Sequence, residues 1–326
     1  MQILHIYPTS RALRRVTQKY KEEDTLLPAL MRMDEFEKRA ILIDNKRQID
    51  PLQRILLLRE AAKFEAFEEM KFDVSLLRFF TKSDALFKFF EELAAEGIDF
   101  EQLAQADAYA EFGKHLEILE KLLSNYHTLL DKQAFTDKAF IPNSYRLNKD
   151  FLQRYGRIEI HLEGYLTHFE LKLLEEIAQT NPLYIHYTTS PFNLKMQERF
   201  KEIGVFLSND SHVYFSLSEK KVIDEVKNDA SINAKVYAVE EREEQIAVAF
   251  KEIEQMVRVG IQPEEIVLIL PDESFKEHFR LFDKHHNLNF AMGYNYSDGK
   301  VYKSLDALYR YWQQYDKESI KRLEAY

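Results

Sequence analysis

Four basic side chains near the N-terminus have the spacing of a phosphate-binding helix face. Arg11, Arg14, Arg15 and Lys19 fall on neighbouring faces of a helix predicted over 10–21. Because Lys and Arg provide many of the contacts that proteins make with DNA phosphates, these four are candidate DNA-binding residues. An ordinary solvated helix face is the alternative interpretation.

Two threonines could line a ligand-binding cleft. Thr188 and Thr189 come at the end of a strand predicted over 183–188, and the carboxyl ends of parallel strands commonly border such clefts. Capping of the next helix is the alternative role. His161 and Glu163 point to the same side of another predicted strand, but no nucleophile or second carboxylate can be placed beside them. The sequence therefore predicts no catalytic residue and no metal site.

Composition excludes several classes of site. The 326-residue chain contains no cysteine, which excludes disulfides, thiolate nucleophiles and cysteine-ligated zinc or iron–sulfur centres. Its net charge of −10 argues against a protein that coats nucleic acid by itself, although a local basic stripe is compatible with it. No apolar run reaches the ~18 residues of a membrane helix, and the N-terminus lacks the features of a secretion signal. We therefore expect a cytoplasmic protein with no membrane partner.

Hydrophobic spacing predicts an α/β protein. The predicted strands cover 2–7, 157–162 and 183–188, and the predicted helices cover 10–21, 168–179 and 193–203. Strands alternating with helices of this length are typical of a parallel sheet built from βαβ units. Ser10 is the expected N-cap of the first helix. Residues 25–33 should be extended, and a further helix should begin at Asp34 with Glu37 as its capping-box residue.

An almost wholly helical segment over about 50–155 interrupts this alternation. Leu86, Phe89, Phe90 and Leu93 form one apolar helix face. A longer seam with spacings of three and four residues consists of Phe112, Leu116, Leu119, Leu123, Tyr126 and Leu130. The seam is short for a coiled coil, so we expect it to pack inside the molecule, with docking of a partner protein as the alternative.

The polar, poorly periodic segment 207–233 is the predicted domain boundary. Beyond it we expect strands over 235–239 and 266–270 and helices over 241–259, 273–286 and 301–315. The predicted organisation is an α/β domain over 1–48 and 156–230, a helical insertion over 49–155, and the start of a second, truncated α/β domain over 231–326.

In this order the elements resemble the N-terminal region of AddB- and RecB-like helicase–nuclease subunits of the PD-(D/E)xK family. Residues 241–282 resemble the start of the second motor domain, with an acidic helix start, a glycine turn and a buried strand. Residues 158–177 resemble the Walker-B-like strand and its helix, with Thr-His-Phe-Glu at 167–170 where the family has Thr-Pro-x-Glu. Residues 50–64 and the helices up to about 103 resemble the family's helical insertion.

The resemblance implies a helicase-like fold, related to P-loop NTPases, with a degenerate nucleotide site. A P-loop needs G-x-x-x-x-G-K-[ST], because backbone amides and the lysine wrap the phosphates. Residues 7–11 (YPTSR) stand in its place, and the first glycine of the chain is Gly97. The candidates for a degenerate nucleotide site are Pro8, Thr9, Ser10 and, at the Walker-B position, Glu163.

By resemblance, the complete protein processes DNA double-strand breaks for recombination together with an AddA-like helicase subunit. This segment would bind DNA and scaffold the motor without breaking bonds, and it would need no cofactor. The family's nuclease domain holds Mg²⁺ through two acids beside a lysine, and we expect that domain beyond Tyr326. The alternatives are a protein-interaction module without DNA binding and a nucleotide-binding enzyme with a non-P-loop site near Thr188 and Glu163.

Overall fold

The computed structural model divides into two compact units, Met1–Ala230 and Ser231–Tyr326. The structure describes residues 2–20, 26–70, 72, 75–105, 113–228, 234–272, 274–291 and 296–314. The division between the units coincides with the predicted start of the second domain at residue 231.

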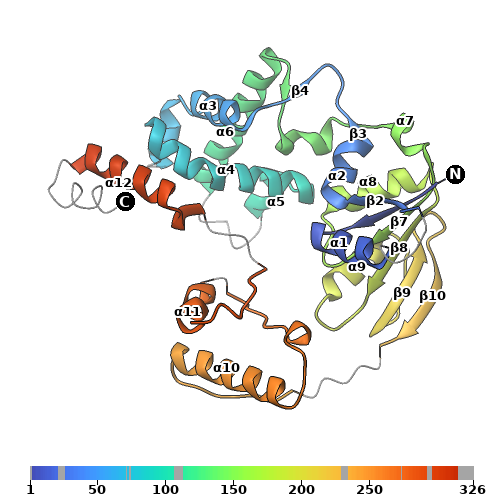
Figure 1. Ribbon diagram of the computed structural model, residues 1–326. Coiled ribbons are helices and arrows are strands. Elements are labelled where there is room, and N and C mark those ends of the chain that lie inside the picture. Colours follow the sequence, from blue (N-terminus) through green and yellow to red (C-terminus); the bar gives the residue numbers. More distant parts are fainter. Residues whose placement is uncertain are drawn as a thin grey trace. The chain divides into compact units, whose positions relative to one another are not determined.

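A six-stranded sheet forms the centre of the first unit, in the order β10-β9-β8-β7-β1-β2 (Figure 1). The parallel strands are β1 (Gln2–Tyr7), β2 (Ala29–Arg32), β7 (Tyr155–His161) and β8 (Leu183–Thr188). An antiparallel hairpin of β9 (Ser211–Ser216) and β10 (Lys221–Lys227) extends the sheet beyond β8. The predicted α/β class with a mostly parallel sheet is confirmed. The division between the two units falls within the predicted boundary segment 207–233, but this segment also contains the hairpin, for which no strand was predicted.

The hairpin was not predicted because β10 lies at the sheet edge and buries little apolar surface. Val222 packs against the core, but Ile223 and Val226 are 49% and 60% exposed. An edge strand with solvent beside it keeps a polar composition, and its charged side chains discourage pairing with another chain. The segment therefore lacks the apolar alternation by which strands are recognised in a sequence.

Alternation along the inner strands gives the sheet two different faces. The apolar face carries the buried side chains of Leu4, Ile6, Ile158, Ile160 and Ile185. The opposite face carries the histidines and charged residues of the same strands together with Tyr7 and Tyr184, because successive side chains of a strand point to opposite sides. This second face is called the polar face below.

Three helices pack on the apolar face, namely α2 (Met33–Ala40), α8 (His168–Ala178) and α9 (Leu194–Glu202). Each directs an apolar stripe at the sheet, and Phe36, Leu174 and Phe200 are completely buried there. Burying one such side chain contributes roughly 1.5–3 kcal/mol. In contrast, α1 (Ser10–Lys19) lies beside β1 and β2 and buries none of its residues.

Two helix starts differ from the predictions. The N-cap of α1 is Thr9 and not Ser10, because the Thr9 Oγ1 accepts a hydrogen bond from the Ala12 amide at 3.2 Å. Helix α2 begins without a side-chain cap, so the capping box predicted for Asp34 and Glu37 is wrong. The carboxyl group of Glu37 lies instead beside a second carboxyl group from α8.

Between α2 and β7 the chain forms a helical body with its own core. Its helices are α3 (Pro51–Ala61), η2 (Glu65–Met70), α4 (Leu76–Glu96), α5 (Phe100–Gln105), α6 (Gly113–Lys132) and η4 (Lys138–Asn143). Two short strand pairs accompany them, β3 (Ile41–Leu42) with β6 (Arg146–Leu147) and β4 (Arg47–Gln48) with β5 (Phe135–Thr136). After them α7 (Lys149–Leu152) buries Phe151 and Leu152 in the core of the sheet, so the helical body ends before the predicted limit of 155.

The two predicted apolar helix faces form the core of the helical body. The first face, Leu86, Phe89, Phe90 and Leu93, packs there as expected. The described seam residues in the same core are Leu116, Leu119, Leu123, Tyr126 and Leu130, and Phe112 lies outside the described residues. Leu116, Tyr126 and Leu130 are buried and Leu119 and Leu123 are partly buried there, so the seam packs inside the molecule as expected.

The second unit is helical in its described residues. Its elements are α10 (Arg242–Arg258), η5 (Pro263–Glu265), α11 (Phe275–Phe282), η6 (Tyr296–Asp298) and α12 (Lys300–Gln314). The strands predicted over 235–239 and 266–270 are wrong, since neither forms a strand and Val267 and Ile269 are 78% and 80% exposed. A strand needs a hydrogen-bonded neighbour, and the described part of this unit contains none. None of the helices described in either unit could cross a membrane.

Candidate functional site

The connection between β1 and α1 leaves no room for a wrapped phosphate. Pro8 and Thr9 are the two residues between the strand and the helix. The Thr9 hydroxyl caps the helix, and the Arg32 Nη1 donates a hydrogen bond to the Ser10 Oγ at 3.2 Å. The helix start is thus occupied by the chain's own side chains, which agrees with the expected loss of a P-loop.

The basic residues predicted to contact DNA form one exposed face of α1. Arg11, Arg14, Arg15 and Lys19 are all exposed, whereas Leu13 and Val16 are half-buried on the side toward the sheet. Among the described residues, no acidic side chain pairs with Arg14, Arg15 or Lys19. Unpaired cations on one helix face are available to a polyanion.

The two threonines predicted to line a cleft have different roles. Thr189 is completely buried, its hydroxyl donates a hydrogen bond to the Ser208 carbonyl at 2.7 Å, and the same oxygen accepts one from the Ser211 amide at 2.9 Å. The Thr189 hydroxyl therefore stabilises the connection between β8 and β9. The prediction that Thr189 lines the cleft is wrong. Thr188 is exposed, and its Oγ1 lies 2.7 Å from the Nδ1 of His212.

Thr188 and the other cleft candidate, Glu163, do line one cavity. This cavity of about 430 Å³ lies over the ends of β7, β8 and β9. Its polar lining consists of His161, Glu163, His186, Thr188, His212, Tyr214 and Asp224. The residues that line this cavity include two carboxylates and no lysine or arginine that could bind the phosphates of a nucleotide. The cavity lining therefore gives no support to the alternative of a nucleotide-binding enzyme with a non-P-loop site.

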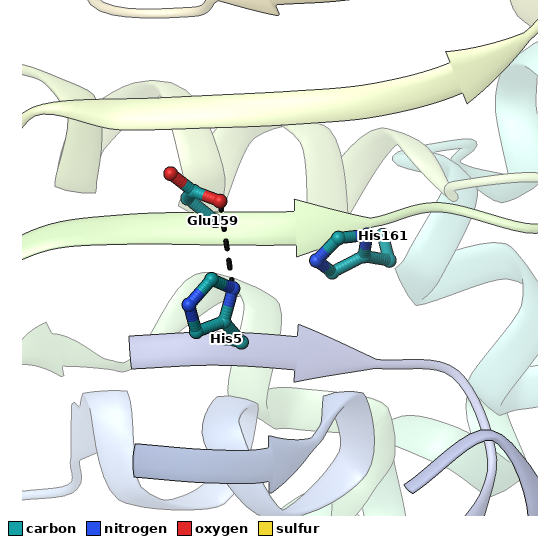
Figure 2. Close-up of side chains that lie close together, drawn as sticks. All are labelled: His5, Glu159 and His161. Atoms are coloured by element: carbon teal, nitrogen blue, oxygen red, sulfur yellow. Dashed lines mark ion pairs between the residues drawn. The ribbon is translucent and has the colours of Figure 1, made fainter. Parts of the chain in front are cut away.

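A cluster of histidines around a carboxylate is the most unusual feature of the polar face. His5 of β1 is the direct register partner of Glu159 on β7. Figure 2 shows these two side chains facing each other across the strands, with His161 two residues farther along β7. The ligand atoms of His5, Glu159 and His161 all lie within 4.8 Å of one another. We call these three residues the His–Glu cluster.

Glu159 is the electrostatic centre of this cluster. Its Oε2 lies 3.4 Å from the His5 Nδ1 and 3.4 Å from the His186 Nε2, and its Oε1 lies 2.7 Å from the Arg157 Nη2. Glu159 is 8% exposed, and the guanidinium of Arg157 is the positively charged partner of this nearly buried carboxyl group. Arg157 is itself held over the ring of Tyr184, with 4.2 Å between its Cζ and the ring centroid.

A stack of rings runs across the polar face beside the cluster. Tyr7, His161, His186 and Tyr214 come from β1, β7, β8 and β9, and consecutive ring centroids are 4.3, 4.4 and 4.4 Å apart. The first two pairs are almost parallel, at 2° and 3°. Because the inner rings already cover one another's faces, only their edges are available to a ligand. The stack is therefore a poor platform for nucleotide bases, which bind to ring faces.

Burial keeps the imidazoles of the cluster uncharged. It lowers the pKa of His161 to about 4, with repulsion from His186 and His5 adding to the effect. Burial likewise lowers the pKa of His5, against the opposing attraction of Glu159. At neutral pH both rings are neutral and each has one nitrogen lone pair that can accept a proton or a metal ion.

Sequence reasoning considered His161 with Glu163 and overlooked His5, Glu159 and His186. The available signal was a histidine at an inner position of three separate apolar strands, in ILHIY, IEIHL and YIHYT. The parallel order β1-β7-β8 and its register then place those side chains side by side. The register between strands more than 150 residues apart could not be read from the sequence.

No family model and no curated protein matches the sequence of this chain.

Proposed function

We propose that this chain is a non-catalytic, helicase-like segment that binds DNA and scaffolds a motor partner during the processing of double-strand breaks. The nuclease activity and its Mg²⁺ would belong to a further domain of the complete protein, and an AddA-like subunit would supply translocation. This proposal rests on the resemblance of the element order in the first unit, because the buried strand that the resemblance implies over 266–270 is not formed. The exposed basic face of α1 is the observation that carries it.

The arrangement of α1 suits contact with a DNA backbone. The helix follows β1 directly, so its basic face is held by the central sheet and does not depend on a flexible arm. Lys and Arg contacts to phosphates fix the position of a protein on DNA and carry no base specificity. The segment should therefore bind DNA of any sequence, with an affinity that falls as salt rises.

Binding of labelled single-stranded and blunt duplex DNA tests the proposal. Replacing Arg14, Arg15 and Lys19 with glutamine should weaken binding to DNA of unrelated sequences about equally. Each lost phosphate contact should reduce the slope of log affinity against log salt by ~1, so the triple variant should lose ~2–3 from the slope. Fluorescence anisotropy at several salt concentrations measures both quantities.

The matched control removes three positive charges from other positions of the first unit. Lys172, Lys195 and Lys201 are exposed residues of α8 and α9, the helices that pack on the apolar face of the sheet. Their replacement with glutamine changes the net charge by the same amount and should leave affinity and salt slope close to those of the unchanged protein. If the two triple variants bind alike, or if the unchanged chain binds neither kind of DNA at low salt, the proposal is rejected.

A further inference from the structure

The His–Glu cluster contains two buried ring nitrogens without hydrogen-bond partners. These atoms are the Nδ1 of His5 and the Nε2 of His161, and neither has a hydrogen-bond partner among the described residues, although the His5 Nδ1 lies 3.4 Å from the Glu159 Oε2. A buried polar atom left unpaired is destabilising, so native proteins rarely retain one without a use. Two such atoms beside one carboxylate point to a ligand that accepts electron pairs from all three.

The distances between the ligand atoms of the His–Glu cluster fit metal coordination better than hydrogen bonding. The His5 Nδ1 and the Glu159 Oε2 are 3.4 Å apart, which is long for a hydrogen bond. Nitrogen and oxygen ligands ~2.0–2.2 Å from a tetrahedral zinc ion lie about 3.3–3.6 Å from one another. The His161 ligand atom lies within 4.8 Å of the other two and needs a modest rotation of its side chain to complete the set.

The neighbours of Glu159 orient its Oε2 so that this oxygen is available to a metal ion. Arg157 engages the Oε1 at 2.7 Å, and the Oε2 remains directed toward the imidazoles. Partners that orient a ligand in this way are a regular part of metal sites. His186 also lies 3.4 Å from the Oε2, but its ring is stacked at 3° on that of His161. Ligand lone pairs lie in the ring plane, so two rings stacked as closely as those of His161 and His186 cannot share one ion. The His5 ring is tilted by 25° to the His161 ring and offset from it, with 5.8 Å between their centroids.

We propose that His5, Glu159 and His161 together bind one Zn²⁺ ion, or a divalent transition-metal ion of similar preference. Two imidazoles and a carboxylate suit zinc, whereas Mg²⁺ and Ca²⁺ prefer oxygen ligands alone. Three protein ligands leave a fourth position for water, and the neighbouring cavity, which His161 also lines, provides a path for the ion. The ion would join the central strands β1 and β7. The site does not depend on the proposed DNA binding.

Calorimetric titration of the metal-free, tag-free chain with Zn²⁺ tests this assignment. We expect saturable binding of one ion per chain, and no comparable binding of Mg²⁺. The variants His5→Gln and His161→Gln each remove one nitrogen ligand and should weaken Zn²⁺ binding at least about tenfold. His212→Gln is the control, because His212 lies on β9 beside Thr188 and outside the His–Glu cluster; this variant should bind like the unchanged chain.

A second measurement on the unchanged chain covers the case in which a variant does not fold. In NMR spectra, Zn²⁺ should strongly shift the ring resonances of two of the ten histidines in the chain, those of His5 and His161. Cobalt substituted for zinc should give the intense visible absorption of a four-coordinate site. The assignment is overturned if Zn²⁺ does not bind, if folded His5→Gln and His161→Gln bind as well as the His212→Gln control, or if Zn²⁺ leaves all histidine resonances unchanged.

Discussion

Replacing Asp137 with alanine is expected to lower the free energy of unfolding of the first unit by about 3–5 kcal/mol. Asp137 is 1% exposed, and both of its oxygens accept hydrogen bonds from Arg54, at 2.8 Å each. The Tyr126 hydroxyl donates a third hydrogen bond to the Oδ2 at 2.8 Å. Without the carboxylate, the half-buried guanidinium and the buried phenol both lose their partner.

Arg54 keeps two other contacts when Asp137 is removed, so we expect a loss of unfolding free energy near the lower end of about 3–5 kcal/mol. Its Nη2 lies 2.6 Å from Glu91, and its Cζ lies 3.8 Å from the ring centroid of Phe87. Both interactions stabilise the positive charge after Asp137 is removed. Urea unfolding at neutral pH, followed by far-ultraviolet circular dichroism, measures the change.

The control is a surface ion pair of the same helical body. Asp131 lies 2.5 Å from Lys46 and is well exposed, so Asp131→Ala should cost less than about 1 kcal/mol. The double variant Arg54→Met with Asp137→Leu removes both charges and should recover most of the loss. Equal unfolding midpoints for Asp137→Ala and Asp131→Ala would show that the buried pair contributes no more than a surface pair.

Replacing Glu37 with glutamine is expected to stabilise the protein, by about 4 kcal/mol near pH 8. Burial, together with repulsion from Glu170 and a hydrogen bond to it, raises the pKa of Glu37 to about 8. Asp34 adds to the rise, and Lys38 opposes it. One oxygen of Glu37 is buried without a hydrogen-bond partner among the described residues. Glutamine keeps the shape of the protonated acid and has no charge to bury.

Glu170 cannot move away from Glu37, because it also caps α8. Its Oε2 accepts hydrogen bonds from the Thr167 amide at 2.6 Å and from the Thr167 hydroxyl at 2.8 Å, and the Thr167 Oγ1 accepts one from the Glu170 amide. These hydrogen bonds hold the Glu170 carboxyl group beside Glu37, and the raised pKa is that of Glu37.

The direction of the pH dependence follows from the raised pKa of Glu37. In the unfolded chain this group ionises near its ordinary value of 4.5, whereas in the folded protein it stays protonated up to about 8. Its contribution to stability is fully present below pH 4.5 and is lost as the pH rises through 8. The difference between Glu37→Gln and the unchanged protein should thus be small at pH 4.5 and grow toward pH 8.

Unfolding experiments at several pH values check this expectation. Glu35 is the control, because it lies on the same helix, is more than one-third exposed and pairs with Arg39 at 2.5 Å. Glu35→Gln should change the free energy of unfolding by less than about 0.5 kcal/mol at any of these pH values. Parallel pH profiles for Glu37→Gln and the unchanged protein would contradict the assignment of a raised pKa.

The periodicity of apolar residues was sufficient to predict the strands and helices that bury one apolar face. The strands at 2–7, 157–162 and 183–188 and the helices around 168–179 and 193–203 were predicted because their side chains repeat with the period of the element. The incorrect predictions concern segments whose structure depends on the strands beside them. The edge strand β10 buries too little to show a period, and the apolar segment 266–270 has no strand beside it.

The sequence by itself determined the composition of the polar face and the loss of a P-loop. Residues 7–11 lack glycine and lysine, and a histidine occupies an inner position of each of three strands. Only the tertiary structure decided which of these side chains meet. His5 and Glu159 are separated by more than 150 residues, and they become partners because β7 adds to β1 in one register. That register is selected by burial of the opposite, apolar face, since a shift of one residue would expose Leu4 and Ile6 to solvent.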